Sequence, residues 1–250
     1  MNTMNNMNTP TTQKNAGLLE SVMQKLFTRT AQVLEIEDIG RAFRLLTLGS
    51  DALRNVEWTP GDKIQIQLGG WVQRTYTPID WDATKGCTRI LIYLHADGPG
   101  TQWARTVRKG DACVVFGPRK SVRLPHPHTP VLLFGDETSL GLAVALSRQP
   151  SAPTVQTLLE ISTPADVTPV IDLLQLDHVQ LCRRLDDEAH FSALETSMAA
   201  LLQAHATADI VLTGKAGAIQ HLSKLLRSRE IAAGRRQSKA YWAPGKTGLD

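Results

Sequence analysis

A change in hydrophobic pattern near residue 126 constrains the fold of this 250-residue chain more than any other feature. Residues 17–125 contain several short runs of alternating apolar and polar residues, such as "DKIQIQL" at 62–68, and no long helical pattern. Turn residues separate these runs, as in Pro-Gly-Asp at 60–62. Because several short strands without helices are typical of closed or layered sheets, we expect a β-barrel or a β-sandwich in this half of the chain.

From residue 130 onward, strands and helices alternate. Apolar runs at 130–135, 154–162 and 208–214 are typical of buried strands, and amphipathic runs such as 191–206 are typical of helices. This alternation predicts a parallel sheet with right-handed crossovers. Ligands of such sheets lie beyond the carboxyl ends of the strands, so residues that follow these runs are candidates for binding.

We therefore expect two domains preceded by a tail. Residues 1–16 are polar and lack the apolar core of a signal peptide, which predicts a disordered tail. Residues 17–126 form the expected β domain and residues 127–250 the expected α/β domain. The proline-rich segment "SVRLPHPHTP" contains the linker between them.

Charge and cysteine usage exclude several classes of protein. The net charge of +3 is too small to indicate a nucleic-acid-binding protein. The three cysteines are scattered without a C-x-x-C pair, and the seven histidines show no metal-ligand spacing, so we expect no metal site. No apolar run approaches the roughly 20 residues of a membrane span. We expect a cytoplasmic monomer that binds neither membrane nor nucleic acid.

The stretch "QRTYTPIDWD" at 73–82 carries the first candidate binding residues. Strand alternation places Arg74 and Tyr76 on one face, and Thr75 and Thr77 on the other. A fixed cation beside a flat aromatic ring suits a ligand that is both anionic and planar. The alternative is a solvated strand face, for which this composition is also common.

The stretch "LHADGPGTQWARTV" at 94–107 carries the second group. A predicted strand ends at His95, a turn follows at Gly98 and Gly100, and Thr101 begins a short helix. Free backbone N–H groups and the positive end of the helix dipole favour an anion such as pyrophosphate. The alternative is a turn without a ligand. Together with the Arg-Tyr pair, this turn predicts a site for a flavin dinucleotide, which combines a planar ring system with a pyrophosphate.

Five motifs occur in the order that is typical of siderophore-interacting proteins: "RTYTP", "LHADGPGTQWA", "GDACVVFGPRKSV", "GDETSL" and a late "YW". The chain resembles this family over roughly residues 30–245. Its members are FAD-dependent ferric-siderophore reductases of the ferredoxin-reductase superfamily. The resemblance implies an antiparallel FAD-binding β-barrel followed by a parallel-sheet α/β domain that binds the nicotinamide nucleotide.

The resemblance also implies roles for individual residues. Arg74 would pair with the FAD phosphate, Tyr76 would pack along the flavin, and Thr77 would bond near its reactive nitrogen. Asp136 and its two successors would lie near the nicotinamide. The full set of implied cofactor-binding residues is Arg74, Thr75, Tyr76, Thr77, His95, Gly98, Gly100, Thr101, Asp136, Glu137, Thr138 and Trp242.

Three further positions qualify this assignment. Tyr241 or Trp242 would cover the exposed flavin face; alternatively, Trp242 plugs the seam between the domains, as large aromatic residues near a terminus often do. Members of the family commonly have proline where this chain has Gly141, and an acidic residue where it has Lys215. The second departure changes the charge at a strand end, where nucleotide or substrate contacts are expected.

Basic residues suggest where an acidic iron chelate docks. Lys120 and Arg123 follow the barrel motifs, and Arg235 and Arg236 precede the C-terminal aromatic pair. We interpret these four residues as a substrate-binding patch, with a solvated basic face as the alternative.

The predicted activity is electron transfer from NAD(P)H through FAD to a ferric siderophore, which releases ferrous iron. The flavin carries this chemistry, so no catalytic residue is expected. Ser139 lacks the first glycine of a G-x-S-x-G elbow and is not a credible hydrolase nucleophile. The alternative function is a flavoprotein that binds a ferric chelate, or exchanges electrons with a ferredoxin-type partner, without nicotinamide-dependent turnover.

Overall fold

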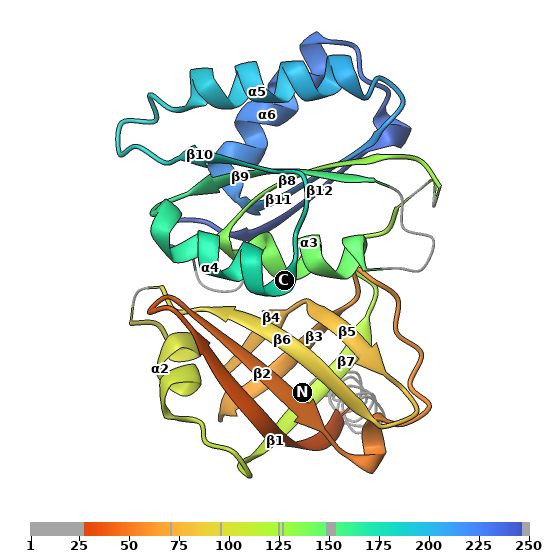
Figure 1. Ribbon diagram of the computed structural model, residues 1–250, viewed down its shortest axis with the longest axis vertical. Helices are drawn as coiled ribbons and strands as arrows, with labels where there is room; N and C mark the ends of the chain where they lie inside the picture. Colours follow the sequence, from red (N-terminus) through yellow and green to blue (C-terminus); the bar gives the residue numbers. More distant parts are fainter. Residues whose placement is uncertain are drawn as a thin grey trace, which may run out of the picture.

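The structure, a computed structural model, describes residues 28–70, 72–95, 97–124, 126, 128–148 and 154–246. The predicted tail at 1–16 lies outside these residues. The described chain forms an antiparallel sheet unit followed by a parallel α/β unit, one stacked on the other in Figure 1. The predicted fold class is therefore confirmed.

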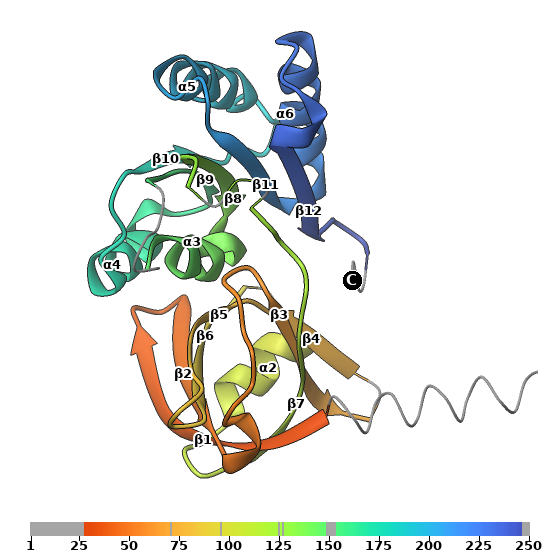
Figure 2. The same cartoon turned by 90° about the vertical axis from the view of Figure 1, so that its right-hand side faces the viewer.

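The first unit is a strongly curved sheet of seven strands in the order β4-β3-β7-β1-β2-β6-β5. The strands are β1 (Thr28–Ile39), β2 (Phe43–Gly49), β3 (Lys63–Gly69), β4 (Val72–Tyr76), β5 (Pro78–Asp82), β6 (Cys87–Tyr93) and β7 (Ala112–Arg119). The two edge strands, β4 and β5, are consecutive in the chain and are joined by Thr77 alone. The sheet must therefore curl until its edges meet, which gives the rolled form visible in Figure 2.

Alternation along the strands fills the inside of this curl. In β6 every second residue is buried, namely Thr88, Ile90 and Ile92. Ile90 and Ile92 pack in a core with Ile64 and Ile66 of β3, as the period of two in the sequence predicts. Helix α2 (Pro99–Thr106) contributes Ala104 to the same core, which fixes this short helix against the sheet.

The second unit is a parallel sheet in the order β10-β9-β8-β11-β12. Its strands are β8 (Val131–Asp136), β9 (Val155–Ile161), β10 (Val179–Arg183), β11 (Asp209–Lys215) and β12 (Arg236–Trp242). Helices α3 (Leu140–Ser147) and α4 (Pro164–Leu174) cover the face toward the first unit, and α5 (Phe191–Ala204) and α6 (Ala216–Ser228) cover the other face (Figure 1). The strand order reverses between β8 and β11, and such a switch point is where ligands bind in sheets of this kind.

The seam between the units is apolar and continuous. Ile79 of β5 lies in one core with Leu140 and Val144 of α3. At the edge of the seam, Arg148 approaches Asp80 with 3.7 Å between Nη1 and Oδ2. Burial of apolar side chains from both units holds the strand ends of the second unit at a fixed place relative to β4 and β5.

None of the helices in the described part of the chain combines the length and apolar character that crossing a membrane requires. No group of three or more metal-ligating side chains occurs among the same residues.

Candidate functional site

The strand β4 and the start of α2 lie against each other, as the two sequence motifs require. A Cβ atom at Gly100 would stand 3.2 Å from Cγ of Arg74 and 3.3 Å from the Tyr76 hydroxyl oxygen. Glycine at this position therefore lets the first turn of α2 approach Arg74 and Tyr76 closely. Gly98 is the N-cap and Pro99 the first helical residue, so the free amides at the start of α2 belong to the turn that contacts these two side chains.

Arg74 is partly buried, and within the described part of the chain its side chain makes one hydrogen bond, from Nη1 to the backbone oxygen of Gln73 at 2.8 Å. Among the residues that the structure describes, no carboxylate forms an ion pair with it. Its guanidinium group is therefore available to an anionic ligand. A cation and a helix N-terminus that adjoin the same space form an anion site.

Tyr76 and Thr77 complete the barrel side of the site. Burial raises the pKa of the Tyr76 hydroxyl, and the nearby Arg74 charge only partly opposes this shift. Thr75 pairs with Gln65 of β3, on the opposite face from Arg74 and Tyr76. Thr77 lies in the corner between the edge strands, beside Tyr241 of β12. Burial raises the pKa of Tyr241 to about 12, and its contact with Thr77 acts in the opposite direction.

His95 connects the barrel to the C-terminal strand. Its ring stacks on Tyr93 at 5.1 Å between centroids and lies 6.4 Å from the ring of Trp242. The Thr101 hydroxyl donates to the backbone oxygen of His95 at 2.9 Å, which holds the start of α2 beside this residue. Both Thr101 and Trp242, predicted site residues 141 positions apart in the sequence, are thus arranged around His95.

Asp136 ends β8 and is only 1% exposed. Its carboxylate accepts hydrogen bonds from the backbone N–H of Thr138 at 2.9 Å and from the indole Nε1–H of Trp242 at 2.7 Å. Burial raises the pKa of this carboxyl, while the bonds from Thr138 and Trp242 oppose the shift. Ser139 is fully buried and bonded to Thr213, which agrees with the expectation that it is no nucleophile.

Glu137 belongs to a buried ion network at the ends of β8, β9 and β10 that the sequence analysis missed. Arg184 donates to Glu137 at 3.1 Å and lies 3.4 Å from Glu160, which also contacts Nε2 of His190 at 2.6 Å. The Glu137 carboxylate also accepts from the backbone N–H of Ser162 at 2.5 Å. Glu137 is therefore committed to partners within the protein.

A signal for this network was present in the sequence. Glu160 stands inside the otherwise apolar run "TVQTLLEIS", and a buried carboxylate requires a partner. Two consecutive arginines, Arg183 and Arg184, follow in the next strand run. Nothing in the sequence indicates which arginine turns inward, because both lie at a strand end.

The two departures from the family pattern have local partners. Gly141 lies in α3 where a Cβ atom would be 3.1 Å from the backbone oxygen of Thr77, so α3 approaches the corner of the barrel closely. Lys215 is at the N-cap of α6, with 3.8 Å between its Nζ and Oε1 of Glu188.

Two of the four predicted substrate-binding residues, Arg123 and Arg235, bond to partners within the protein, and the Arg123 backbone N–H bonds to Gln237, the neighbour of Arg236. Lys120 is exposed and follows β7 at the barrel end that faces the seam. Arg123 is paired with the buried Asp62 at 2.5 Å. Arg235 donates to the backbone oxygen of Ala208, before the start of β11, and Arg236 begins β12. The length of β12, roughly 20 Å at about 3.3 Å per residue, separates this arginine pair from Trp242.

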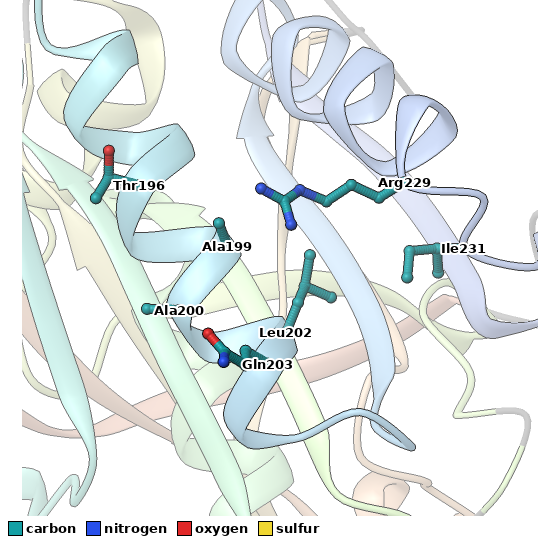
Figure 3. Close-up of a pocket in the computed structure, with 7 residues that line it drawn as sticks. All are labelled: Thr196, Ala199, Ala200, Leu202, Gln203, Arg229 and Ile231. Carbon is teal, nitrogen blue, oxygen red and sulfur yellow. The ribbon is translucent and has the colours of Figure 1, made fainter.

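A pocket shown in Figure 3 lies elsewhere. It is lined by residues of the C-terminal half of α5 and by residues that follow α6. Both segments adjoin the amino ends of the parallel strands, because α5 leads into β11 and the residues after α6 lead into β12. This pocket is thus at the opposite sheet edge from Asp136 and Trp242, and contains none of the predicted site residues.

Comparisons with known proteins agree with this architecture. The model of the siderophore-interacting FAD-binding domain matches residues 69–122, and that of the siderophore-interacting protein matches residues 128–245. The NADPH-dependent ferric-chelate reductase of Escherichia coli is 22% identical over 265 residues, covering 89% of this chain and 96% of that protein.

Solved structures show the same fold. A siderophore utilization protein from T. fusca superposes with a TM-score of 0.71 at 22% identity, over 89% of this chain and 95% of that one. The siderophore-interacting protein SipS from Aeromonas hydrophila gives 0.71 at 22% identity, over 88% and 93%. Phthalate dioxygenase reductase gives 0.71 at 14% identity, over 90% and 71%. On the two family matches, which together span the Arg74 motif and the whole parallel sheet, the chain belongs to the siderophore-interacting protein family.

Proposed function

We propose that this protein is an FAD-dependent oxidoreductase that transfers electrons from NAD(P)H to a ferric siderophore and releases ferrous iron. The observation that carries the proposal is the close approach of Arg74 and Tyr76 to the first turn of α2, which glycine at position 100 permits. The same turn is linked to the parallel sheet through His95, whose backbone oxygen accepts from Thr101 and whose ring lies 6.4 Å from that of Trp242 at the end of β12. The family matches and the Escherichia coli ferric-chelate reductase support the same activity.

The residues at this contact fit FAD. Arg74 and the amides from Gly98 to Thr101 suit the pyrophosphate, since a guanidinium and a helix N-terminus both favour phosphate oxygens. Tyr76 offers an aromatic face, and Thr77 lies at the corner nearest the parallel sheet. Bound there, FAD would supply the change from two-electron donor to one-electron acceptor. The protein then has to bind the FAD, orient it and shield it from water.

The donor site is proposed at the ends of β8 and β11. Of the three residues expected near the nicotinamide, Asp136 is bonded to Trp242 and Glu137 to Arg184. The Thr138 hydroxyl donates a hydrogen bond to the Asp136 carboxylate. We infer that these side chains shape the sheet edge through their partners within the protein, and that direct contacts to the donor come mainly from backbone and exposed groups at the strand ends.

We propose a smaller substrate patch than the four residues that the sequence suggested. Lys120 is exposed at the seam. Lys239 of β12 shares a strand face with Gln237, which bonds to the linker, and with Tyr241, which contacts Thr77. Lys239 therefore faces the barrel corner, whereas Arg235 and Arg236 are at the far end of the strand. Two ammonium groups at the seam suit an anionic ferric chelate.

The test is rapid mixing of the FAD-loaded protein with NADH and NADPH separately, followed through bleaching of the flavin band. Fast bleaching with either donor, then reoxidation by a ferric siderophore, is the expected result. Absence of bleaching with both donors would favour the alternative, a flavoprotein that receives electrons from a ferredoxin-type partner. The monomeric state and the cytoplasmic location remain predictions, to be tested by sedimentation and by fractionation of cells.

A further inference from the structure

Arg44 joins strand β2 to the last turn of helix α2. Its Nε and Nη2 donate to the two carboxylate oxygens of Asp38, at 2.6 and 3.1 Å, and its Nη1 donates to the backbone oxygen of Ala104. Asp38 of β1 stands directly opposite Arg44 in the β1–β2 ladder. The Arg44 side chain is only 16% exposed, so its guanidinium is held in one orientation between the strand pair and the helix.

The Ala104 oxygen needs such a donor because the helix leaves it without one. Helix α2 ends at Thr106, and the last four carbonyl groups of a helix have no amide partner within it. The N–H of Arg108 would reach Ala104 if the helix continued, but it donates to Oδ2 of Asp111 at 2.8 Å. Ala104 itself is fully buried in the barrel core. Arg44 therefore satisfies a buried carbonyl, and its positive charge stands at the negative end of the helix dipole.

The other end of α2 carries the expected phosphate site. There the first turn approaches β4 closely at Gly100. The side chains of Thr101 and Gln102 bond to backbone oxygens of the chain just before the helix, at 2.9 and 3.0 Å. These two bonds tie the start of α2 to the turn that leads into it, whereas the bond from Arg44 ties the helix to a strand of the sheet.

The short length of α2 makes its two ends move together. A helix of eight residues spans about 12 Å, at about 1.5 Å per residue. It has no room for a bend between its last turn and its first. A change in how the sheet holds the last turn therefore changes where the amides of the first turn stand.

We propose that Arg44 is a positioning residue for FAD: it holds the last turn of α2 against the β1–β2 strand pair, and thereby places the amides of the first turn for the pyrophosphate. The attachment of the helix is a property of the protein alone, whereas its consequence for FAD rests on the proposed function. Arg44 acts through the helix and does not itself contact the cofactor.

The first experiment measures amide hydrogen exchange by mass spectrometry in the protein without FAD. Arg44→Gln is the informative change, because its amide nitrogen falls where Nε stood and still bonds to Asp38, but cannot reach Ala104. Exchange in residues 98–107 should become about two- to tenfold faster, since an unsatisfied carbonyl loosens the end of the helix. Exchange in β7 should stay the same. Equal exchange of residues 98–107 in both proteins would overturn the attachment.

The second experiment measures the dissociation constant of FAD by fluorescence titration, with urea unfolding of each variant in parallel. Arg44→Gln should bind FAD about two- to tenfold more weakly, because the amides of the first turn are no longer held in place. Asp38→Asn is the matched control: it removes the exposed ion pair and leaves Arg44 to hold Ala104, so its FAD affinity should stay within about twofold of wild type.

A second control separates positioning from general stability. Leu53 is fully buried in the same core, under the segment Asp51–Leu53 and outside α2. Leu53→Ala opens a cavity there and lowers the urea midpoint, but it leaves the bond between Arg44 and Ala104 intact. The folded variant should therefore bind FAD as tightly as wild type.

Other outcomes count against the proposal. Equal losses of FAD affinity in Asp38→Asn and Arg44→Gln would assign the effect to the ion pair, and a comparable loss in Leu53→Ala would assign it to general stability. Faster exchange with unchanged FAD affinity would confine Arg44 to the stability of the helix. If Arg44→Gln does not fold, Arg44→Lys carries both measurements with the same expected results, because its ammonium ends one bond before Nη1. If wild type does not bind FAD, the proposed function fails, while hydrogen exchange still decides the attachment.

Discussion

Arg74→Ala separates cofactor binding from stability of the fold. Among the described residues, the Arg74 side chain makes one hydrogen bond, to the backbone oxygen of Gln73, and its aliphatic part adjoins the turn at Gly100. A charge-assisted bond to phosphate contributes about 1.5–3 kcal/mol. Its loss should weaken FAD binding by roughly ten- to a hundredfold. The protein without FAD should lose less than about 1 kcal/mol of its free energy of unfolding, because one partly exposed bond disappears.

The assay is titration of the FAD-free protein with FAD, followed by quenching of flavin fluorescence, together with urea unfolding of each variant without cofactor. Arg74→Lys should recover part of the affinity, since an ammonium restores charge but not the planar pair of donors. Arg108→Ala is the matched control. It removes the same charge from the same unit, but Arg108 is exposed and lies beyond the opposite end of α2. An Arg74→Ala protein that binds FAD as tightly as wild type would refute the assignment of the phosphate site.

Further predictions test other parts of the structure. Gly100→Val should abolish detectable FAD binding at micromolar cofactor in the same fluorescence titration, because even its Cβ atom would crowd Arg74 and Tyr76 and the larger side chain would displace them. Arg184→Ala should lower the free energy of unfolding by about 3–5 kcal/mol in urea melts, since two buried carboxylates lose their cation. Lys239→Ala should weaken the binding of an anionic ferric chelate and reduce the salt dependence of that binding. The affinity for a neutral chelate should not change. All three tyrosines, Tyr76, Tyr93 and Tyr241, have a raised pKa, so the folded protein should show less phenolate absorbance near pH 10 than the unfolded chain. The stability that these neutral hydroxyls contribute is fully present below the unfolded pKa of about 10 and is lost as the pH rises through the raised values. Identical titration curves for the folded and the unfolded protein would contradict this.

Much of the architecture was predictable because it depends on short-range patterns. The period of two in 62–68 and the alternation of strands and helices after residue 130 identified the two kinds of sheet. The turn at Gly98 and Gly100 indicated an anion site, since a glycine turn before a helix exposes backbone N–H groups whatever the rest of the fold. In each case the segment that carries the signal also carries the structural cause.

The partners of charged residues were not predictable in this way. Arg235 and Arg236 are close to Trp242 in sequence, but an extended strand places them at opposite ends of the sheet. Glu137 seemed free to meet a ligand, yet Arg184 from another strand neutralises it. A charge in a sequence does not reveal its neighbour, because that neighbour depends on strand order and register.

The sequence by itself determined the two sheets, the strand ends where a ligand is expected, and the residue types that suit a flavin dinucleotide. Only the tertiary structure decided which of these residues face a ligand and which face each other. Asp136 and Trp242 are 106 positions apart and meet because β8, β11 and β12 lie side by side, with Gly214 leaving room between them. The physical reason is that the hydrophobic period depends only on neighbouring residues in the sequence. A hydrogen bond between distant strands forms only after the whole sheet has packed.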